Sequence, residues 1–147
     1  MAADPVFLDT NVLVAATVVT HPAHAAAGAL LDKLTNEQTP LCISVQVCRE
    51  FLVVLTRQPV EGRTFTVEEA LASLDTWRSA ASTLDEDGGV LLELLSLVRA
   101  RQVRGKQVHD ANIVAVMLAN GITRLATFNV GDFQRYEDEI RIEAPAS

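Results

Sequence analysis

Three acidic side chains stand where the surrounding sequence is apolar. Asp9 directly follows the apolar run Val6–Leu8, and Glu50 lies in a helical segment with apolar residues on both flanks. Asp110 holds the first position of an apolar stripe that continues to Met117 at helical spacing. An unpaired carboxylate is costly in apolar surroundings, so each of these acids needs partners. Carboxylates that are brought together repel one another, and they must then take up protons or bind a cation.

Each acid also has an ordinary structural role open to it. Asp9 could form a turn or cap a helix, and Asp110 could sit favourably at the positive end of a helix dipole. Glu50 could face solvent, as most helical glutamates do. The functional interpretation therefore depends on whether the fold brings the three together.

A second apolar run ends in the same way as the first. Leu125-Ala126-Thr127 stops at the turn Asn129–Asp132. Short apolar runs without alternation are typical of strands that are buried on both faces, and ligands of parallel sheets bind at the carboxyl ends of strands. We therefore expect this turn and Asp9 to meet at one edge of a sheet. The start of the helix with Asp110, and Glu50 a turn or two into its own helix, can reach the same place.

The expected cluster offers oxygen ligands, which suit hard cations such as Mg²⁺ or Mn²⁺. It contains no cysteine, and His109 is the only nearby imidazole, which argues against zinc. Mg²⁺ held by a few carboxylates keeps several waters and recruits substrate phosphates. The ion would then supply positive charge where a phosphate binds.

Alternating strand and helix signals must position these residues. Strands are expected at 6–8, 41–43, 125–127 and 140–142, the last at a sheet edge, with a brief strand end at 84–85. Five helices are expected. The first follows Thr20-His21-Pro22 and carries the apolar stripe of Ala27, Leu30, Leu31 and Leu34, and the second runs from Ser44 to about Arg57. The third begins at the capping box Thr66–Glu69, the fourth covers Leu91 to Val98 after a turn at Asp87-Gly88-Gly89, and the fifth begins at Val108-His109-Asp110 and stops at Asn120-Gly121. The alternation predicts one α/β domain over residues 1–147, with a central parallel sheet of about four to five strands flanked by helices.

Composition limits how such a chain could handle nucleic acid. The 147 residues, 49% of them hydrophobic, are enough for a real core. Lys and Arg number 12 against 19 Asp and Glu, for a net charge of −7. Phosphate neutralisation supplies much of nucleic-acid affinity, so binding would need a bound cation or a local basic patch. The only dense basic stretch, Arg99 to Lys106, is either a solvated helix end or a contact for a phosphate backbone.

The N-terminus and the cysteines favour a cytoplasmic protein. Met1–Pro5 lacks the basic segment of a secretory signal, and the run Val12–Val19 is too short to span a membrane. Cys42 and Cys48 are expected to be buried packing residues rather than a disulfide or a metal site.

Two histidines lie close together in the sequence. His21 and His24 are three positions apart and have no third histidine nearby, so a surface or hydrogen-bonding role is favoured over metal binding.

Four stretches occur in the order and at the spacing of one known family. They are 7–13 (FLDTNVL), 46–51 (QVCREF), 109–115 (HDANIVA) and 125–133 (LATFNVGDF). Together they resemble the PIN domain, and specifically the VapC-type ribonuclease toxins of bacterial toxin–antitoxin pairs. The resemblance covers nearly the whole chain and implies a PIN-like parallel sheet flanked by helices. It also implies metal-dependent cleavage of single-stranded or looped RNA that leaves a 5′-phosphate and a 3′-hydroxyl.

The resemblance further implies a role for individual residues. Asp9, Glu50 and Asp110 match three near-invariant acids of the family, and Thr127 matches a hydroxyl that helps to hold the site. Asp9 and Asp110 would hold the principal Mg²⁺ or Mn²⁺, and Glu50 would bind a metal water or act as general base. Thr10 and Asn11 would support the site.

One position departs from the family pattern. The fourth acid is replaced by Asn129, and Asp132 follows three residues later. Asn129 can supply a carbonyl ligand but no charge, so either Asn129 or Asp132 would position a second, substrate-assisted ion. Arg101, Arg104 and Lys106 are candidates for guiding RNA to the metal.

The toxin resemblance implies two partners besides RNA. One is a cognate antitoxin, whose tail lies in a hydrophobic groove and carries a basic residue into the acidic pocket, and the other is a second copy in a homodimer.

Two other functions stay open. One is a PIN nuclease for RNA processing or DNA repair without an antitoxin. The other is a non-catalytic interaction module with a vestigial acidic site, which Asn129 favours. A metal phosphatase or phosphoacceptor domain would need an acidic pair after the first strand, which Thr10-Asn11 does not provide.

Overall fold

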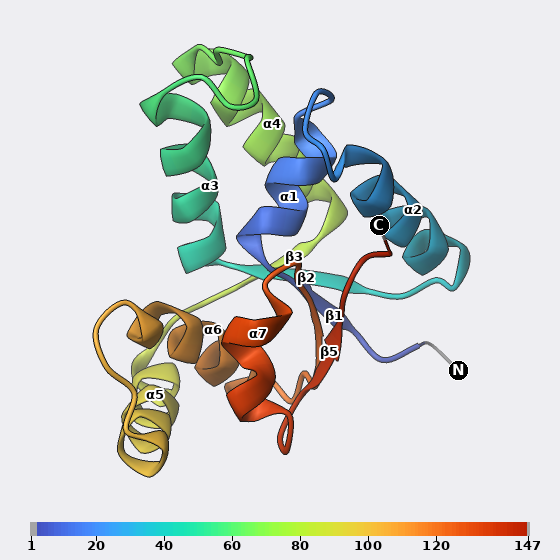
Figure 1. The fold of residues 1–147 in the computed structure, drawn as a ribbon. Coiled ribbons are helices and arrows are strands. Elements are labelled where there is room, and N and C mark those ends of the chain that lie inside the picture. The colour runs from blue at the N-terminus through green and yellow to red at the C-terminus, as the bar shows by residue number, and fades with distance from the viewer. Residues whose placement is uncertain (1–2, 147) are drawn as a thin grey trace.

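Five short parallel strands form the centre of the computed structural model, which describes residues 3–146. They are β1 (Val6–Leu8), β2 (Leu41–Ser44), β3 (Ser82–Leu84), β4 (Arg124–Ala126) and β5 (Arg141–Glu143). Their order across the sheet is β3-β2-β1-β4-β5, so the first strand of the chain is the central one (Figure 1). Every neighbouring pair is parallel. The predicted parallel sheet of four to five strands, with the last strand at an edge, is confirmed.

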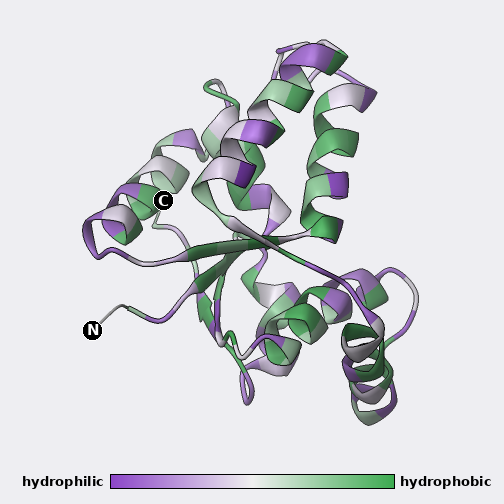
Figure 2. Cartoon of the chain, turned by 180° about the vertical axis from the view of Figure 1, so that it is seen from behind, coloured by the Kyte–Doolittle hydropathy of each residue, from purple (hydrophilic) through white to green (hydrophobic). Residues whose placement is uncertain are grey.

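Helices cover both faces of this sheet. They are α1 (Thr10–Thr17), α2 (His24–Asn36), α3 (Val45–Arg57), α4 (Val67–Ala80), α5 (Gly88–Arg101), α6 (Gln107–Ala119), the short α7 (Val130–Phe133) and the 3-10 turn η1 (Gln134–Tyr136). The first four lie on one side of the sheet and α5, α6 and α7 on the other (Figures 1 and 2). Between residues 3 and 146, no helix has the length and apolar character needed to cross a membrane. Met1 and Ala2, part of the segment considered as a secretory signal, lie outside the described residues.

The central strand explains why its sequence does not alternate between polar and apolar residues. Val6, Phe7 and Leu8 are all completely buried, because helices pack on both faces of the sheet. Figure 2 shows the hydrophobic residues concentrated on the strands and on the helix faces turned toward them. Full burial of each such side chain contributes roughly 1.5–3 kcal/mol, so the strand that carries Asp9 is firmly anchored.

Several predicted helix ends are confirmed by their caps. The Ser44 hydroxyl accepts from the Val47 amide at 3.3 Å at the start of α3. Thr66 and Glu69 form a complete capping box at the start of α4. At the end of α6, Gly121 has a φ of 68°, the left-handed conformation that glycine adopts without strain.

Some elements differ from the sequence expectations. The apolar stretch after Asn11, to which no element was assigned, forms α1. The predicted turn at Asp87-Gly88-Gly89 is wrong, because the Asp87 carboxylate accepts from the Val90 amide at 3.1 Å and caps α5, which begins at Gly88. The helix expected from Thr20-His21-Pro22 begins only at His24.

The basic stretch is divided between a helix and a connection. Helix α5 ends at Arg101, and Gln102 follows with a φ of 52°. Arg104 and Lys106 therefore lie in the segment that leads into α6, and Lys106 is the N-cap residue of that helix.

The two cysteines pack as predicted. Cys42 is buried on β2, Cys48 is half-buried on α3, and both thiols are free. Burial raises the pKa of both thiols above the ordinary value.

Candidate active site

The carboxyl ends of β1 and β4 meet at the centre of the sheet and hold a buried acid. The Asp9 amide donates to the Ala126 carbonyl at 3.0 Å, which ties the two strand ends together. The Asp9 carboxylate is almost fully buried and accepts from the Thr10 amide at 2.8 Å and the Thr127 hydroxyl at 2.9 Å. The Asn11 side-chain amide is a third donor at 3.3 Å. Asp9 is also the N-cap residue of α1, so the capping role that the sequence left open is confirmed.

Thr127 joins β4 to the start of α1. Its hydroxyl oxygen accepts from the Asn11 side-chain amide at 3.2 Å and from the Asn129 backbone amide at 3.0 Å. With both acceptor positions in use, the Thr127 proton is directed at Asp9. The side-chain oxygen of Asn11 in turn accepts from the Phe128 backbone amide at 3.1 Å. These bonds fix the orientation of the Asp9 carboxylate.

Glu50 approaches from α3, and Thr10 links it to the buried acid. The Thr10 hydroxyl donates to Glu50 Oε1 at 3.0 Å, while the Thr10 amide donates to Asp9. Glu50 is half-buried because α3 packs against α1. One residue therefore holds two acids from distant parts of the chain at a fixed separation.

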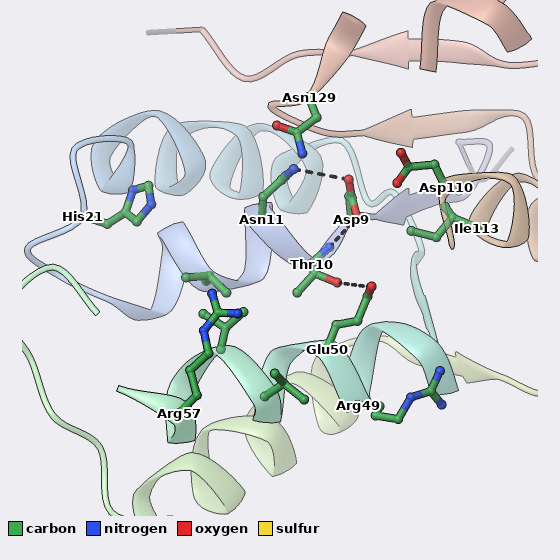
Figure 3. Close-up of a pocket in the computed structure, with 13 residues that line it drawn as sticks. Asp9, Thr10, Asn11, His21, Arg49, Glu50, Arg57, Asp110, Ile113 and Asn129 are labelled. Atoms are coloured by element: carbon green, nitrogen blue, oxygen red, sulfur yellow. Dashed lines mark hydrogen bonds between the residues drawn. The ribbon is translucent and has the colours of Figure 1, made fainter. Parts of the chain in front are cut away.

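Asp110 comes from the first turn of α6, across from the other two acids, and Asn129 comes from the turn after β4 (Figure 3). Asp9, Glu50, Asp110 and Asn129 all line one cavity of about 530 Å³, together with Thr10 and Asn11. Asp132 does not line it, although its charge acts on Asp110. Of the two candidates for a fourth ligand, the structure therefore places Asn129 at the cavity and Asp132 beside it.

Electrostatics at this cavity disfavour negative charge. The pKa of Asp9 is raised from 3.8 to about 6, chiefly by burial; the charges of Asp110 and Glu50 contribute in the same direction, and the hydrogen bonds from Thr127 and Thr10 oppose the shift. The pKa of Asp110 is likewise raised from 3.8 to about 6, by burial first and then by Asp132 and Glu50. Both acids would lose this penalty if a cation neutralised them.

The donor set fits a hard divalent cation with few protein ligands. Asp9, Glu50 and Asp110 offer carboxylate oxygens to the cavity, and these carboxylates repel one another. Among residues 3–146, no three His, Cys, Asp or Glu side chains are close enough to form a complete cage around an ion. Mg²⁺ does not require such a cage, because it retains waters and shares substrate oxygens. Asp9 and Asp110 are the residues that would hold it.

A second polar network sets the spacing between α3 and α6. The Gln46 side chain donates to the His109 carbonyl at 2.9 Å and accepts from Asn112 at 2.7 Å. Glu86 bridges the same two helices by accepting from the Gln46 amide at 2.6 Å and from the Asn112 side chain at 2.8 Å. Because Gln46 lies one turn before Glu50, and His109 directly precedes Asp110, this network positions two of the three acids. Gln46 begins the stretch 46–51 that carries part of the family resemblance, but the sequence predicted no role for it or for Glu86.

Other cavity residues were also missed. Arg49 and Arg57 of α3 line it. Arg57 lies seven positions after Glu50, on the same face of the helix, and this spacing could have indicated its place. His21 lines the cavity as well, and its Nδ1 accepts from the Ala23 amide at 3.0 Å. His24 Nδ1 lies 2.9 Å from the Ala15 carbonyl, so the predicted hydrogen-bonding role holds for both histidines.

The predicted RNA-guiding residues lie outside this cavity and differ from one another. Arg101 pairs with Asp138 at 2.8 Å and with Glu139 at 2.7 Å, and it also donates to the Arg135 carbonyl. Arg104 and Lys106 are exposed on the segment between α5 and α6.

Comparisons with known proteins agree with this architecture. The sequence model of the PIN domain family matches residues 6–139. No curated protein matches the sequence. A chain in the structure of VapBC2 from Rickettsia felis, bound to a DNA fragment from their promoter, is similar with a TM-score of 0.70 and 20% identity, over 95% of this chain and 97% of that one. A chain of DNA-bound VapBC from Salmonella typhimurium gives 0.69 and 20%, over 98% and 100%. Mycobacterium tuberculosis VapC20, described as a sarcin-ricin loop cleaving toxin, gives 0.65 and 18%, over 86% and 92%.

The raised pKa values predict an unusual pH dependence of stability. Between about pH 4 and 6 the folded chain binds more protons at Asp9 and Asp110 than the unfolded chain does. Without metal, these two groups therefore lower the free energy of unfolding as the pH rises through this window. In EDTA at pH 7.5, Asp110→Asn should raise that free energy by about 1 kcal/mol, after allowance for its partial exposure. The exposed Asp32→Asn on α2 is the matched control, and urea unfolding curves at pH 5 and 7.5 measure both. Equal responses would contradict the repulsion assigned to Asp110.

The buried network predicts a large effect of a single amide. Gln46→Ala leaves the His109 carbonyl without its side-chain donor and the Asn112 side chain with Glu86 as its remaining partner, so it should lower the free energy of unfolding by about 1–3 kcal/mol. Gln58→Ala, at the exposed end of the same helix, should change it by less than about 0.5 kcal/mol. Chemical denaturation of the two variants measures the difference, and similar values would show that the network contributes little.

Proposed function

Because the chain belongs to the PIN domain family, we propose that it is a Mg²⁺- or Mn²⁺-dependent endoribonuclease that acts as the toxin of a toxin–antitoxin pair. The observation that carries the proposal is the meeting of Asp9, Glu50 and Asp110 at one cavity, with the pKa of two of them raised. Carboxylates held at such a penalty are typical of sites that bind a cation.

The residues of the cavity divide the work of phosphodiester hydrolysis. Asp9 and Asp110 would hold the ion, which when bound would lower the pKa of an attacking water and neutralise charge on the phosphoryl oxygens. Thr127 and Asn11 keep the Asp9 carboxylate oriented. Glu50, held by the Thr10 hydroxyl, accepts the proton of the attacking water as general base. The products are a 5′-phosphate and a 3′-hydroxyl.

Asn129 is the neutral member of the site. Its side-chain amide lines the cavity without charge, where another carboxylate would add to the repulsion at Asp110. A second ion at this position would depend on the substrate phosphate for most of its negative partners. Asp132, beside the cavity, contributes through its charge.

We also propose an antitoxin as inhibitor, a homodimer and a cytoplasmic location. The similar Rickettsia and Salmonella chains come from VapBC structures, which supports the antitoxin. The exposed leucines Leu91, Leu92 and Leu95 on α5 offer an apolar surface for a second copy.

Replacing one acid tests the catalytic assignment. Asp9→Asn retains an oxygen that can cap α1 but removes the charge, so it should keep the fold and lower Mg²⁺-dependent RNA cleavage by more than about 100-fold. Purified protein is incubated with total RNA and Mg²⁺, with EDTA and Asp32→Asn as controls, and new 5′ ends are mapped. Cleavage by Asp9→Asn protein at the wild-type rate would refute the assignment.

The basic segment is tested by the salt dependence of binding. In the Asp9→Asn background, alanine at both Arg104 and Lys106 should weaken binding of single-stranded RNA and reduce the slope of log K against log salt by about 1.4. Alanine at Lys33 and Arg78 removes the same charge from other surfaces and should leave the slope unchanged. Arg101→Ala is measured separately, because it also breaks the pairs with Asp138 and Glu139. An unchanged slope in the first variant would assign these residues to plain surface.

A further inference from the structure

The cavity has a second half that the acids do not occupy. Along α3, Arg49 and Glu50 line the cavity at its acidic end, and Val53, Val54 and then Arg57 line it further along the helix. From Glu50 onward, the spacing of i, i+3, i+4 and i+7 places a carboxylate, an apolar wall and a guanidinium in line on one helix face. The seven positions from Glu50 to Arg57 correspond to about 10 Å along the helix axis. Figure 3 shows both long side chains on the same side of α3, turned toward α1.

The apolar wall is only partly covered. Val14 of α1 lines the cavity opposite α3, and Val53 is 49% exposed. Such a slot between two helices offers van der Waals contact to a flat, largely apolar group and has few groups that could read its edges. A nucleobase of any sequence can pack against it through its flat face, whereas a charged side chain placed there would lose hydration without gaining a partner.

The far end of the cavity is a donor site for an anion. His21 Nδ1 accepts the Ala23 amide proton, so the neutral imidazole carries its own proton on Nε2 and can donate it. Arg57 lines the same end, and within residues 3–146 its guanidinium forms no ion pair or hydrogen bond. An unpaired guanidinium next to an imidazole donor matches a phosphate.

We propose that this half of the cavity is a nucleotide subsite for single-stranded RNA. This inference rests on the proposed function. With the scissile phosphate at the acids, the neighbouring base packs on Val14, Val53 and Val54, and the next phosphate binds Arg57 and His21. A protein tail with a basic residue would fit the acidic end, but its charge does not match the cationic end, so RNA is the favoured occupant.

A nucleoside with a phosphate at each end is the minimal probe of this arrangement. Adenosine 3′,5′-bisphosphate and adenosine 5′-monophosphate are titrated by calorimetry into the full chain with Mg²⁺. We expect the bisphosphate to bind at least about tenfold more tightly, since a hydrogen-bonded contact to a charged group is of that size. Arg57→Ala should remove most of this difference, since His21 is then the remaining donor, and leave monophosphate affinity unchanged, whereas Arg57→Lys should keep a larger part of it.

Matched variants separate the two contacts. Val53→Ser should weaken both ligands to the same degree, because it changes only the apolar wall. Arg78→Ala, at an exposed arginine of α4 outside the cavity, should change neither. All variants alter exposed or half-exposed side chains, and circular dichroism checks their fold. If Arg57→Ala protein binds the bisphosphate as wild type does, the proposal is overturned and this end of the cavity is left to a protein partner.

Cleavage kinetics distinguish failure of the subsite from failure of the nuclease. On single-stranded RNA with Mg²⁺, Arg57→Ala should raise KM about tenfold with little change in kcat, as expected for a contact made equally in the ground and transition states. Active protein whose KM does not respond to Arg57→Ala would refute the subsite and leave the nuclease standing. Protein that cleaves no RNA, yet binds the bisphosphate through Arg57, would refute the nuclease and support the anion subsite.

Discussion

The repulsion between the carboxylates of Asp9 after β1, Glu50 in α3 and Asp110 in α6 is the constraint on which the other features of this molecule depend. Gathering Asp9, Glu50 and Asp110 at one cavity does not stabilise the fold, and the raised pKa values of Asp9 and Asp110 reflect part of the penalty. The surrounding structure opposes the repulsion with directed donors. Thr10, Asn11 and Thr127 all donate to these acids. The Gln46–Glu86–Asn112 network links α3 to α6 by further hydrogen bonds. The site is thus preorganised for a cation at the expense of metal-free stability.

The topology makes this gathering possible with short segments. Because β1 is the central strand, its carboxyl end lies next to that of β4 on one side and near that of β2 on the other. Helices α1 and α3 begin directly at the ends of β1 and β2, so their first turns flank the same point. A chain of this order places residues that are 40 or more positions apart within hydrogen-bond distance, as the bond from Thr10 to Glu50 demonstrates.

Sequence patterns predicted the parts of this arrangement that are encoded locally. The unalternating runs at 6–8 and 125–127, the caps at Ser44 and Thr66, and the stop at Gly121 each depend on a few adjacent residues. The Asp87 cap was missed because an Asp-Gly-Gly sequence is equally typical of a turn, and only the following packing of α5 decides between them. The roles of Gln46, Glu86 and His21 could not be assigned because they depend on which helices face each other across the cavity, whereas the helical spacing of Arg57 from Glu50 was visible in the sequence. Arg101 has the charge expected of a nucleic-acid contact, but tertiary folding supplies it with the acids at 138 and 139.

Thr10 has an unusual position in this scheme, since its amide and its hydroxyl serve two different acids. The hydrogen bond from the Thr10 amide to Asp9 is strongest while Asp9 is ionised, and it weakens when that carboxylate takes up a proton. The exchange rate of a single backbone hydrogen with solvent, and its NMR chemical shift, therefore respond to the charge state of the cavity. The Thr10 amide in the first turn of α1 therefore reports the protonation state of the Asp9 carboxylate that it helps to hold.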